Sequence, residues 1–239
     1  MLIEERAIEQ RDGGWHATDR LRAIRIPDSV HGVIAARVDL LDASSRDALR
    51  RCSVMGRTFW PVAVGVDETL VEGLARRGLV SERSASVVAG MREFVFKHAL
   101  THDVAYQTLP RPERRQLHRE VGEWIESAVA HGGGEVAEIA AYHYGRAIEY
   151  GDDDAELAAR TFELLIEAGD AAINQAATSS AIALLERASS LAPDARGRCL
   201  VLVSLGRLAV ATRDHETAIE LLGRARLIGA EAEIGRAHV

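Results

Sequence analysis

A repeat in the C-terminal third constrains the fold of this 239-residue chain more than any other feature of its sequence. Gly169 and Gly206 are 37 residues apart, and the same offset relates further pairs of identical residues around them. These pairs are Leu165 and Leu202, Ala172 and Ala209, Ala181 and Ala218, Leu185 and Leu222, and Ala188 and Ala225. Glycine and alanine leave room where two helices cross, and leucine fills the adjacent hole. The repeat therefore predicts helix pairs that stack to cover each other's apolar faces.

This pattern resembles the tetratricopeptide (TPR) repeat, in which a large residue, a glycine and two alanines recur at such positions. The period exceeds the usual 34 residues by three, and we expect the additional residues in a loop over 194–197, after Pro193. Two repeats are clear, and a less typical helix pair over about 135–165 precedes them. The sequence therefore predicts a TPR-like α-α solenoid over residues 135–233.

The sequence before the repeat predicts three helices in succession. The first begins at Ile26-Pro27-Asp28, because proline there loses no hydrogen bond and an acidic residue favours the positive helix end. Ser44 or Ser45 is expected to cap the second helix. The third begins near residue 68 and is expected to end at Gly78, since glycine is favoured just after a helix.

Two short strands are expected next, over 79–81 and 93–96, and two further helices over 98–109 and 112–129. Three helices followed by a hairpin is the element order of a winged helix. Residues 26–131 are therefore predicted to form a winged-helix domain with a small β-hairpin and the helices that follow it. Together with the repeat, this makes the predicted fold mainly α.

The charged residues and the cysteines exclude several classes of protein. The chain has 29 basic and 36 acidic residues, and its net charge of −7 disfavours a broad phosphate-binding surface. Lys97 is the only lysine, so the chain lacks the Gly-Lys-Ser/Thr of a Walker phosphate-binding loop. Two cysteines make neither a disulfide framework nor a tetrahedral zinc site, which favours a cytoplasmic location. No apolar stretch approaches the length of a membrane span.

The residues with catalytic or metal-binding potential form no recognisable site. His98 and His102 have the spacing of a zinc-protease helix, but Ala99 stands where that motif needs glutamate. We therefore expect no catalytic residue, no metal ligand and no enzymatic activity in this chain.

Three segments resemble the winged-helix region of bacterial STAND-type signalling ATPases. They are residues 26–41, residues 77–80 (Arg-Gly-Leu-Val), and residues 96–106, which begin Phe-Lys-His-Ala-Leu. In that family the region follows an AAA-like nucleotide-binding domain and precedes helical repeats. Members often carry adenylate or guanylate cyclase domains or LuxR-type DNA-binding domains. The resemblance implies a regulatory part of a larger ATPase that binds ATP or ADP with Mg²⁺, with no cofactor held by this part alone.

The resemblance also implies partners and domain boundaries. An upstream nucleotide-binding domain would lie in the same polypeptide, with residues 1–25 as the remnant of its end. A protein or small-molecule inducer would bind the TPR surface. Within residues 1–25 we expect a helix end up to Ile8 and a strand from Trp15. Residues 234–239 match the translation of a common sequencing adapter, and we expect them to be an artefact.

His98 is the one site residue that the resemblance implies. The segment Lys97-His98-Ala99-Leu100 resembles the Met-His-Asp motif of related switch ATPases, in which the histidine contacts the β-phosphate of ADP. An imidazole N–H can donate a charge-assisted hydrogen bond to phosphate. The alternative is that His98 caps the helix that begins there.

Two other functions remain open at this point. A winged-helix transcriptional regulator would bind DNA directly, but the expected third helix carries Asp67, Glu68 and Glu72 against Arg76 and Arg77, which disfavours insertion beside phosphates. Four arginines lie at or near the start of the helix expected over 112–129: Arg111, Arg114, Arg115 and Arg119. We interpret this cluster as a solvent-exposed helix face, in preference to a nucleic-acid contact. The other possibility is an enzyme whose site has no recognisable motif.

Overall fold

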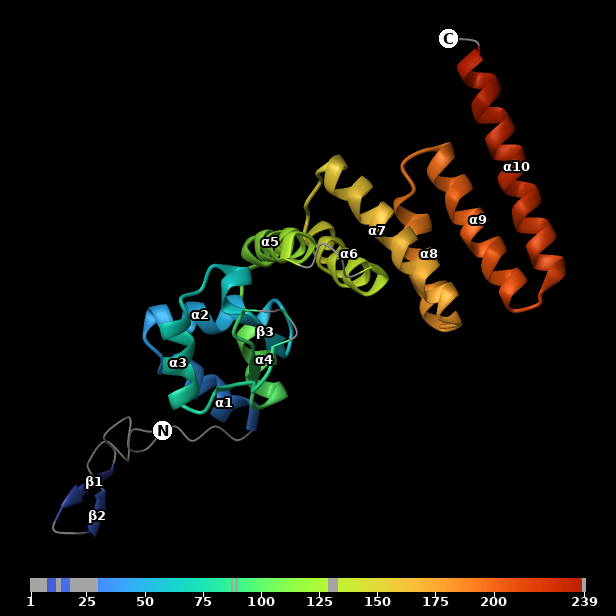
Figure 1. Ribbon diagram of the computed structural model, residues 1–239. Helices are drawn as coiled ribbons and strands as arrows, with labels where there is room; N and C mark the ends of the chain where they lie inside the picture. Colours follow the sequence, from blue (N-terminus) through green and yellow to red (C-terminus); the bar gives the residue numbers. More distant parts are fainter. Residues whose placement is uncertain are drawn as a thin grey trace. The chain divides into compact units, whose positions relative to one another are not determined.

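The computed structural model describes residues 8–11, 14–17, 30–86, 88, 90–128 and 133–237. Over these residues the chain is mainly helical, which confirms the predicted fold class at that level. The chain divides into two compact units (Figure 1). The N-terminal unit contains the residues up to Ser86 and Arg92–Leu109, and the C-terminal unit contains the residues from Pro110 onward. The predicted helix over 112–129 thus belongs to the C-terminal unit.

A β-hairpin lies near the start of the chain. Its strands are β1 (Ile8–Arg11) and β2 (Gly14–Ala17), which pair antiparallel with Gln10 opposite Trp15. The predicted helix end at Ile8 is therefore wrong, because that residue pairs with Ala17 across the hairpin. The predicted strand from Trp15 is present, as part of β2. The expected helix start at 26–28 lies outside the described residues.

The N-terminal unit contains four α-helices among its described residues. They are α1 (Val30–Asp39), α2 (Ala43–Ser53), α3 (Glu68–Arg76) and α4 (Ala99–Gln107), with a 3-10 helix η2 (Pro61–Val64) between α2 and α3. The cap of α2 differs from the prediction: Asp42 is the capping residue, and its carboxylate accepts a hydrogen bond from the backbone N–H of Ser45. Gly78 follows α3 with φ +73°, a left-handed conformation that favours glycine, as predicted.

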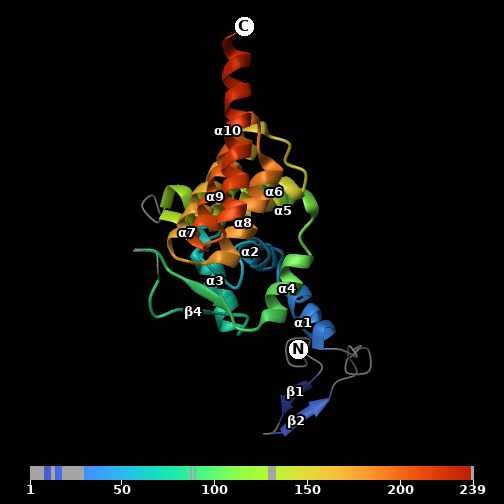
Figure 2. The same cartoon turned by 90° about the vertical axis from the view of Figure 1, so that its right-hand side faces the viewer.

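A three-stranded antiparallel sheet accompanies these helices, in the order β3-β5-β4. Strands β4 (Val80–Glu82) and β5 (Phe94–Phe96) match the predicted strands to within one or two residues, whereas β3 (Thr58–Phe59) was not predicted. Figure 1 labels β3 and Figure 2 labels β4. Phe59, Phe94 and Phe96 are almost fully buried and their rings pack together, so the sheet carries the aromatic core of this unit.

Arg92 ties helix α3 to the sheet. Its guanidinium donates to Glu68 and Glu72 of α3 at 3.0 and 2.7 Å, and to both carboxylate oxygens of Glu82 on β4. These hydrogen bonds raise the pKa of Arg92 and lower that of Glu82. Two of the three acids that the sequence places on or near α3 are therefore engaged in ion pairs within the unit.

The C-terminal unit is a series of helices, each packed against the next along the chain (Figure 1). They are α5 (Arg111–Ala128), α6 (Gly133–Glu149), α7 (Ala155–Asn174), α8 (Thr178–Leu191), α9 (Ala195–Ala211) and α10 (His215–Ala237). The connections from α7 through α10 are three residues each. Short connections of this kind make neighbouring helices antiparallel.

The repeated glycines lie where helices cross, as the sequence predicts. A Cβ placed on Gly169 of α7 would lie 2.8 Å from a methyl carbon of Leu185 on α8, and one on Gly206 of α9 would lie 2.7 Å from Leu222 on α10. The predicted loop over 194–197 is wrong, because Asp194 caps α9 by accepting from the backbone N–H of Gly197. The additional residues of the period therefore lie in the helices.

Candidate functional site

His98 lies at the N-cap position of α4, between strand β5 and the helix. Its side chain is exposed and makes no capping hydrogen bond. At other helix starts, Asp42, Asp67, Asp154 and Asp194 each accept a backbone N–H with the carboxylate. His98 thus occupies the N-cap position, as the alternative expects, although its ring makes no capping hydrogen bond and has no partner among the described residues.

The corner next to His98 is basic. The backbone N–H of Lys97 donates to the carbonyl of Leu79 at 3.1 Å, which holds the start of α4 against the turn after α3. The Lys97 ammonium lies 4.0 Å from where a Cβ on Gly78 would be. Gly78 separates Arg77 from Leu79, and both of these residues line a pocket. The strand-to-helix junction that carries the exposed His98 thus places the only lysine beside the turn whose residues line that pocket.

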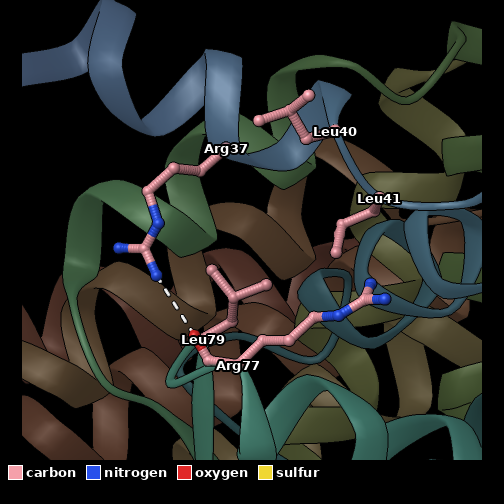
Figure 3. A pocket seen from close by; sticks show the side chains of 5 residues that line it. All are labelled: Arg37, Leu40, Leu41, Arg77 and Leu79. Carbon is pink, nitrogen blue, oxygen red and sulfur yellow. Dashed lines mark hydrogen bonds between the residues drawn. The ribbon is translucent and has the colours of Figure 1, made fainter. Parts of the chain in front are cut away.

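The pocket itself has a volume of about 320 Å³ and lies between α1 and the α3–β4 turn (Figure 3). It is lined by Arg37, Leu40, Leu41, Arg77 and Leu79. Arg37 donates from Nη2 to the carbonyl of Arg77 at 3.1 Å, and this bond spans the pocket. Arg77 places Nη1 3.5 Å from Asp42 Oδ2.

The lining of this pocket indicates what it can bind. Two guanidiniums and three leucine side chains line the pocket, and the carboxylate of Asp42 pairs with Arg77, so positive charge exceeds negative charge there. Arginine binds carboxylate and phosphate oxygens through paired N–H groups. The lining contains no nucleophile or general base, and no group of three or more metal-ligating side chains occurs in the described parts of the chain. The arrangement therefore suits anion binding.

His102, four residues beyond His98, has a structural role. Its ring lies with Nε2 3.0 Å from the carbonyl of Ser53 at the end of α2 and Nδ1 2.9 Å from Asp103. It also packs edge-on against Phe96 of the sheet. His98 and His102, which have the spacing of one helix face, therefore differ in role. His102 holds helix α4 against α2 and the sheet, whereas only His98 is exposed.

The arginines at the start of α5 bind the end of α6 and the loop after it. Arg111 and Arg115 donate to the carbonyls of Glu149 and Gly151, and Arg119 pairs with Asp154 at 2.8 Å. Arginine stabilises a helix C-terminus because the last carbonyls carry partial negative charge. Three guanidiniums also lie 4.7–5.9 Å from the ring centre of Tyr150; they belong to Arg111, Arg114 and Arg146. Arg111 and Arg115 remain exposed, as expected for a solvated face, but their guanidiniums also donate hydrogen bonds within their own unit.

Sequence reasoning missed a buried histidine pair in the C-terminal unit. His118 of α5 and His143 of α6 are each at most 2% exposed, and their Nδ1 atoms lie 2.9 Å apart. Burial lowers the pKa of both imidazoles, and the nearby Arg146 and Arg114 lower that of His118 further. The pairing joins residues 25 positions apart on different helices, so no local spacing signals it.

Within the described parts of the chain, no helix is both long and apolar enough to cross a membrane. Comparison of the chain with models of protein families, with curated proteins and with solved structures found no match.

Proposed function

We propose that this chain is the regulatory part of a STAND-type signalling ATPase. In this proposal the N-terminal unit is a winged-helix domain that senses the nucleotide state of a nucleotide-binding domain in the same polypeptide. The C-terminal unit is a TPR-like array that binds a protein or small-molecule inducer. The output is a nucleotide cyclase or a transcriptional domain, and the protein acts in the cytoplasm.

The observation that carries this proposal is the exposed, unpartnered ring of His98 at the start of α4. It stands at the position that resembles the phosphate-contacting histidine of switch ATPases. The basic pocket edged by Arg37, Arg77 and Lys97 supports the same chemistry, because a nucleotide phosphate carries several negative charges. The residues present therefore fit an ADP phosphate.

The mechanism follows from differential binding. ADP with Mg²⁺, if held by the nucleotide-binding domain, would supply a phosphate anion for the N–H of His98. His98 donates an N–H to that anion and so stabilises the closed, inactive arrangement. An inducer on the repeats favours the open arrangement, in which this hydrogen bond is lost. The ligand shifts the equilibrium only by its difference in affinity for the two arrangements.

The proposal is tested by replacing His98 in the full-length protein. We expect His98→Ala to weaken ADP retention about tenfold or more, because a hydrogen bond to a charged group contributes about 1.5–3 kcal/mol. His215→Ala, at an exposed histidine at the start of α10, is the matched control and should leave ADP affinity unchanged. Equal ADP affinity and basal activity in His98→Ala and the parent protein would contradict the phosphate contact.

The gene itself gives a second test. The sequence that precedes the described region in frame should encode Gly, four residues, and then Gly-Lys-Ser or Gly-Lys-Thr. An in-frame neighbour without that loop would contradict the assignment to an ATPase.

The alternative of direct DNA binding finds less support in the geometry. Glu68 and Glu72 lie on α3 and hold Arg92 in ion pairs, so that face of the helix has acidic groups where DNA binding requires unpaired cations. A gel shift with this chain that weakens steeply with salt would favour the alternative instead.

A further inference from the structure

The pocket between α1 and the turn after α3 combines charge with apolar surface. Three of its five lining side chains are leucines, and Leu40 is 45% exposed, whereas Leu41 and Leu79 are buried. Its volume of about 320 Å³ is at the lower end of the range for pockets that hold small molecules. The pocket therefore has room for a small ligand that is apolar over part of its surface.

Arg37 has hydrogen-bond donors that the fold does not use. A guanidinium carries five N–H groups, and the bond from Arg37 Nη2 to the carbonyl of Arg77 occupies one of them. Among the described residues, no carboxylate forms an ion pair with Arg37. Its guanidinium is therefore the group in this pocket that can receive an anion.

Arg77 contributes in a different way. Its guanidinium lies 3.5 Å from the carboxylate of Asp42, whereas its backbone carbonyl accepts from Arg37. The two guanidiniums consequently point apart, as Figure 3 shows. The alkyl stem of an arginine packs against apolar groups while its charged end stays with a polar partner. Arg77 therefore adds apolar surface beside the leucines, and Asp42 offsets its charge.

The groups around the pocket favour a single negative charge on the ligand. Helix α1 ends at Asp39 and α3 ends at Arg76, so both helices bring their C-terminal ends to the residues that line the pocket. Helix C-termini carry partial negative charge, and Asp42 carries a full one. The positive excess at this corner attracts any anion, including a nucleotide phosphate, but a second negative charge inside the pocket would lack a partner.

We propose that this pocket binds a small carboxylate that carries a compact apolar group. The carboxylate accepts paired N–H groups from Arg37, and the apolar group packs against Leu40, Leu41 and Leu79. This ligand is distinct from the nucleotide phosphate assigned to His98. Its binding goes beyond the proposed function and does not depend on it.

Titration of the whole chain with isocaproate, a small branched carboxylate, tests the proposal. Nuclear magnetic resonance of the nitrogen-15-labelled chain should show saturable shifts of the Gly78 and Leu79 amides, with a Kd of about 1 mM or lower. Acetate lacks the apolar group and isocaproamide lacks the charge, so each should bind at least about tenfold more weakly. No saturable shift with isocaproate, or equal affinity for isocaproamide, overturns the proposal.

Two variants assign the parts of the ligand to residues. Arg37→Gln should weaken isocaproate binding about tenfold and leave isocaproamide binding unchanged, because only the carboxylate uses the guanidinium. Leu40→Ala should weaken isocaproate binding about threefold and leave acetate binding unchanged. Arg57→Gln, at an exposed arginine of the same unit outside the pocket, is the matched control and should bind as the parent does.

The variants also separate ligand binding from folding. Circular dichroism checks that each variant keeps its helix content, and Leu40 is exposed enough that its truncation leaves the core intact. If folded Arg37→Gln binds isocaproate as tightly as the parent chain does, Arg37 only joins α1 to the turn and the proposal is wrong.

Inorganic phosphate and ADP are the competing anions. Each should shift the Gly78 and Leu79 amides at least about tenfold more weakly than isocaproate does. If either binds there more tightly than isocaproate, the pocket is a phosphate site and the carboxylate proposal is wrong. Failure of the proposed function is distinguishable, since isocaproate binding by this chain requires neither ADP nor His98. Unchanged ADP retention in His98→Ala with intact isocaproate binding would refute only the nucleotide switch.

Discussion

At the scale of single residues, the His118–His143 pair is the clearest example of a buried group whose protonation is controlled by its surroundings. With the two Nδ1 atoms 2.9 Å apart, one nitrogen donates and the other accepts, so the accepting ring must be neutral. A proton on the accepting ring would place a second donor in the contact, and a proton on either ring would place a charge in a buried site.

Acid should therefore destabilise the C-terminal unit. The folded-state pKa of both histidines lies below the ordinary value of 6.5, so the unfolded chain takes up protons first. The stabilisation is present above pH 6.5 and is lost as the pH falls below it, with a slope of up to about 1.4 kcal/mol per pH unit for each histidine. Urea unfolding between pH 7.5 and 5.5 measures the loss.

A single substitution checks the source of that slope. His143→Gln removes one titrating ring and should roughly halve the pH dependence of the free energy of unfolding. His31→Gln, at an exposed position of α1, should leave the dependence unchanged. An identical slope in His143→Gln and the parent chain would show that the acid sensitivity arises elsewhere.

At the scale of helix pairs, the two equivalent glycines face leucines with different freedom to move. Leu185 is fully buried, while Leu222 is 39% exposed, although each lies against a glycine in the same way. A methyl group added at either glycine meets its leucine at less than 3 Å, so that leucine must shift. Only Leu222 has open space into which it can shift.

The two alanine substitutions should therefore differ in effect. Gly169→Ala should lower the free energy of unfolding by about 1–2 kcal/mol, since overpacking a closed core outweighs the gain in helix propensity. Gly206→Ala should change it by less than about 0.5 kcal/mol, because propensity offsets a small displacement of Leu222. Thermal or urea unfolding of both variants measures the difference, and equal losses would contradict the unequal freedom of the leucines.

At the scale of the whole molecule, the chain divides into two units between Leu109 and Pro110. We expect the two units to unfold at different pH. Trp60 reports on the N-terminal unit and Trp124 on the C-terminal unit, which holds the buried histidine pair. In single-tryptophan variants, acid unfolding followed by Trp124 should have its midpoint at a higher pH than unfolding followed by Trp60. Coincident midpoints would show one cooperative transition instead.

Local patterns predicted the elements that depend on local chemistry. The end of α3 at Gly78 and the two repeat glycines were found because a left-handed turn and a close helix crossing each restrict the residue type. The sequence predicts Ser44 or Ser45 as the cap of α2, whereas Asp42 caps it; all three side chains can accept the same hydrogen bond, so the residue type does not choose among them.

Features that depend on contacts between distant residues were not predicted. Strand β3 has only two residues, too few for a periodic pattern, and exists because Phe59 pairs with Phe94 far along the chain. Of the candidate site, the sequence identified His98 but missed the pocket between α1 and the turn after α3. Arg37 and Arg77 meet there only because α1 packs near the turn after α3.

The exposed side chain of Lys97 has a practical consequence for chemical labelling. Because the chain contains no other lysine, an amine-reactive dye can attach only to this side chain and to the α-amino group, which gives a single internal site. The Lys97 ammonium lies beside the turn that lines the guanidinium-bearing pocket, so a dye attached there is positioned near that pocket without any engineered cysteine.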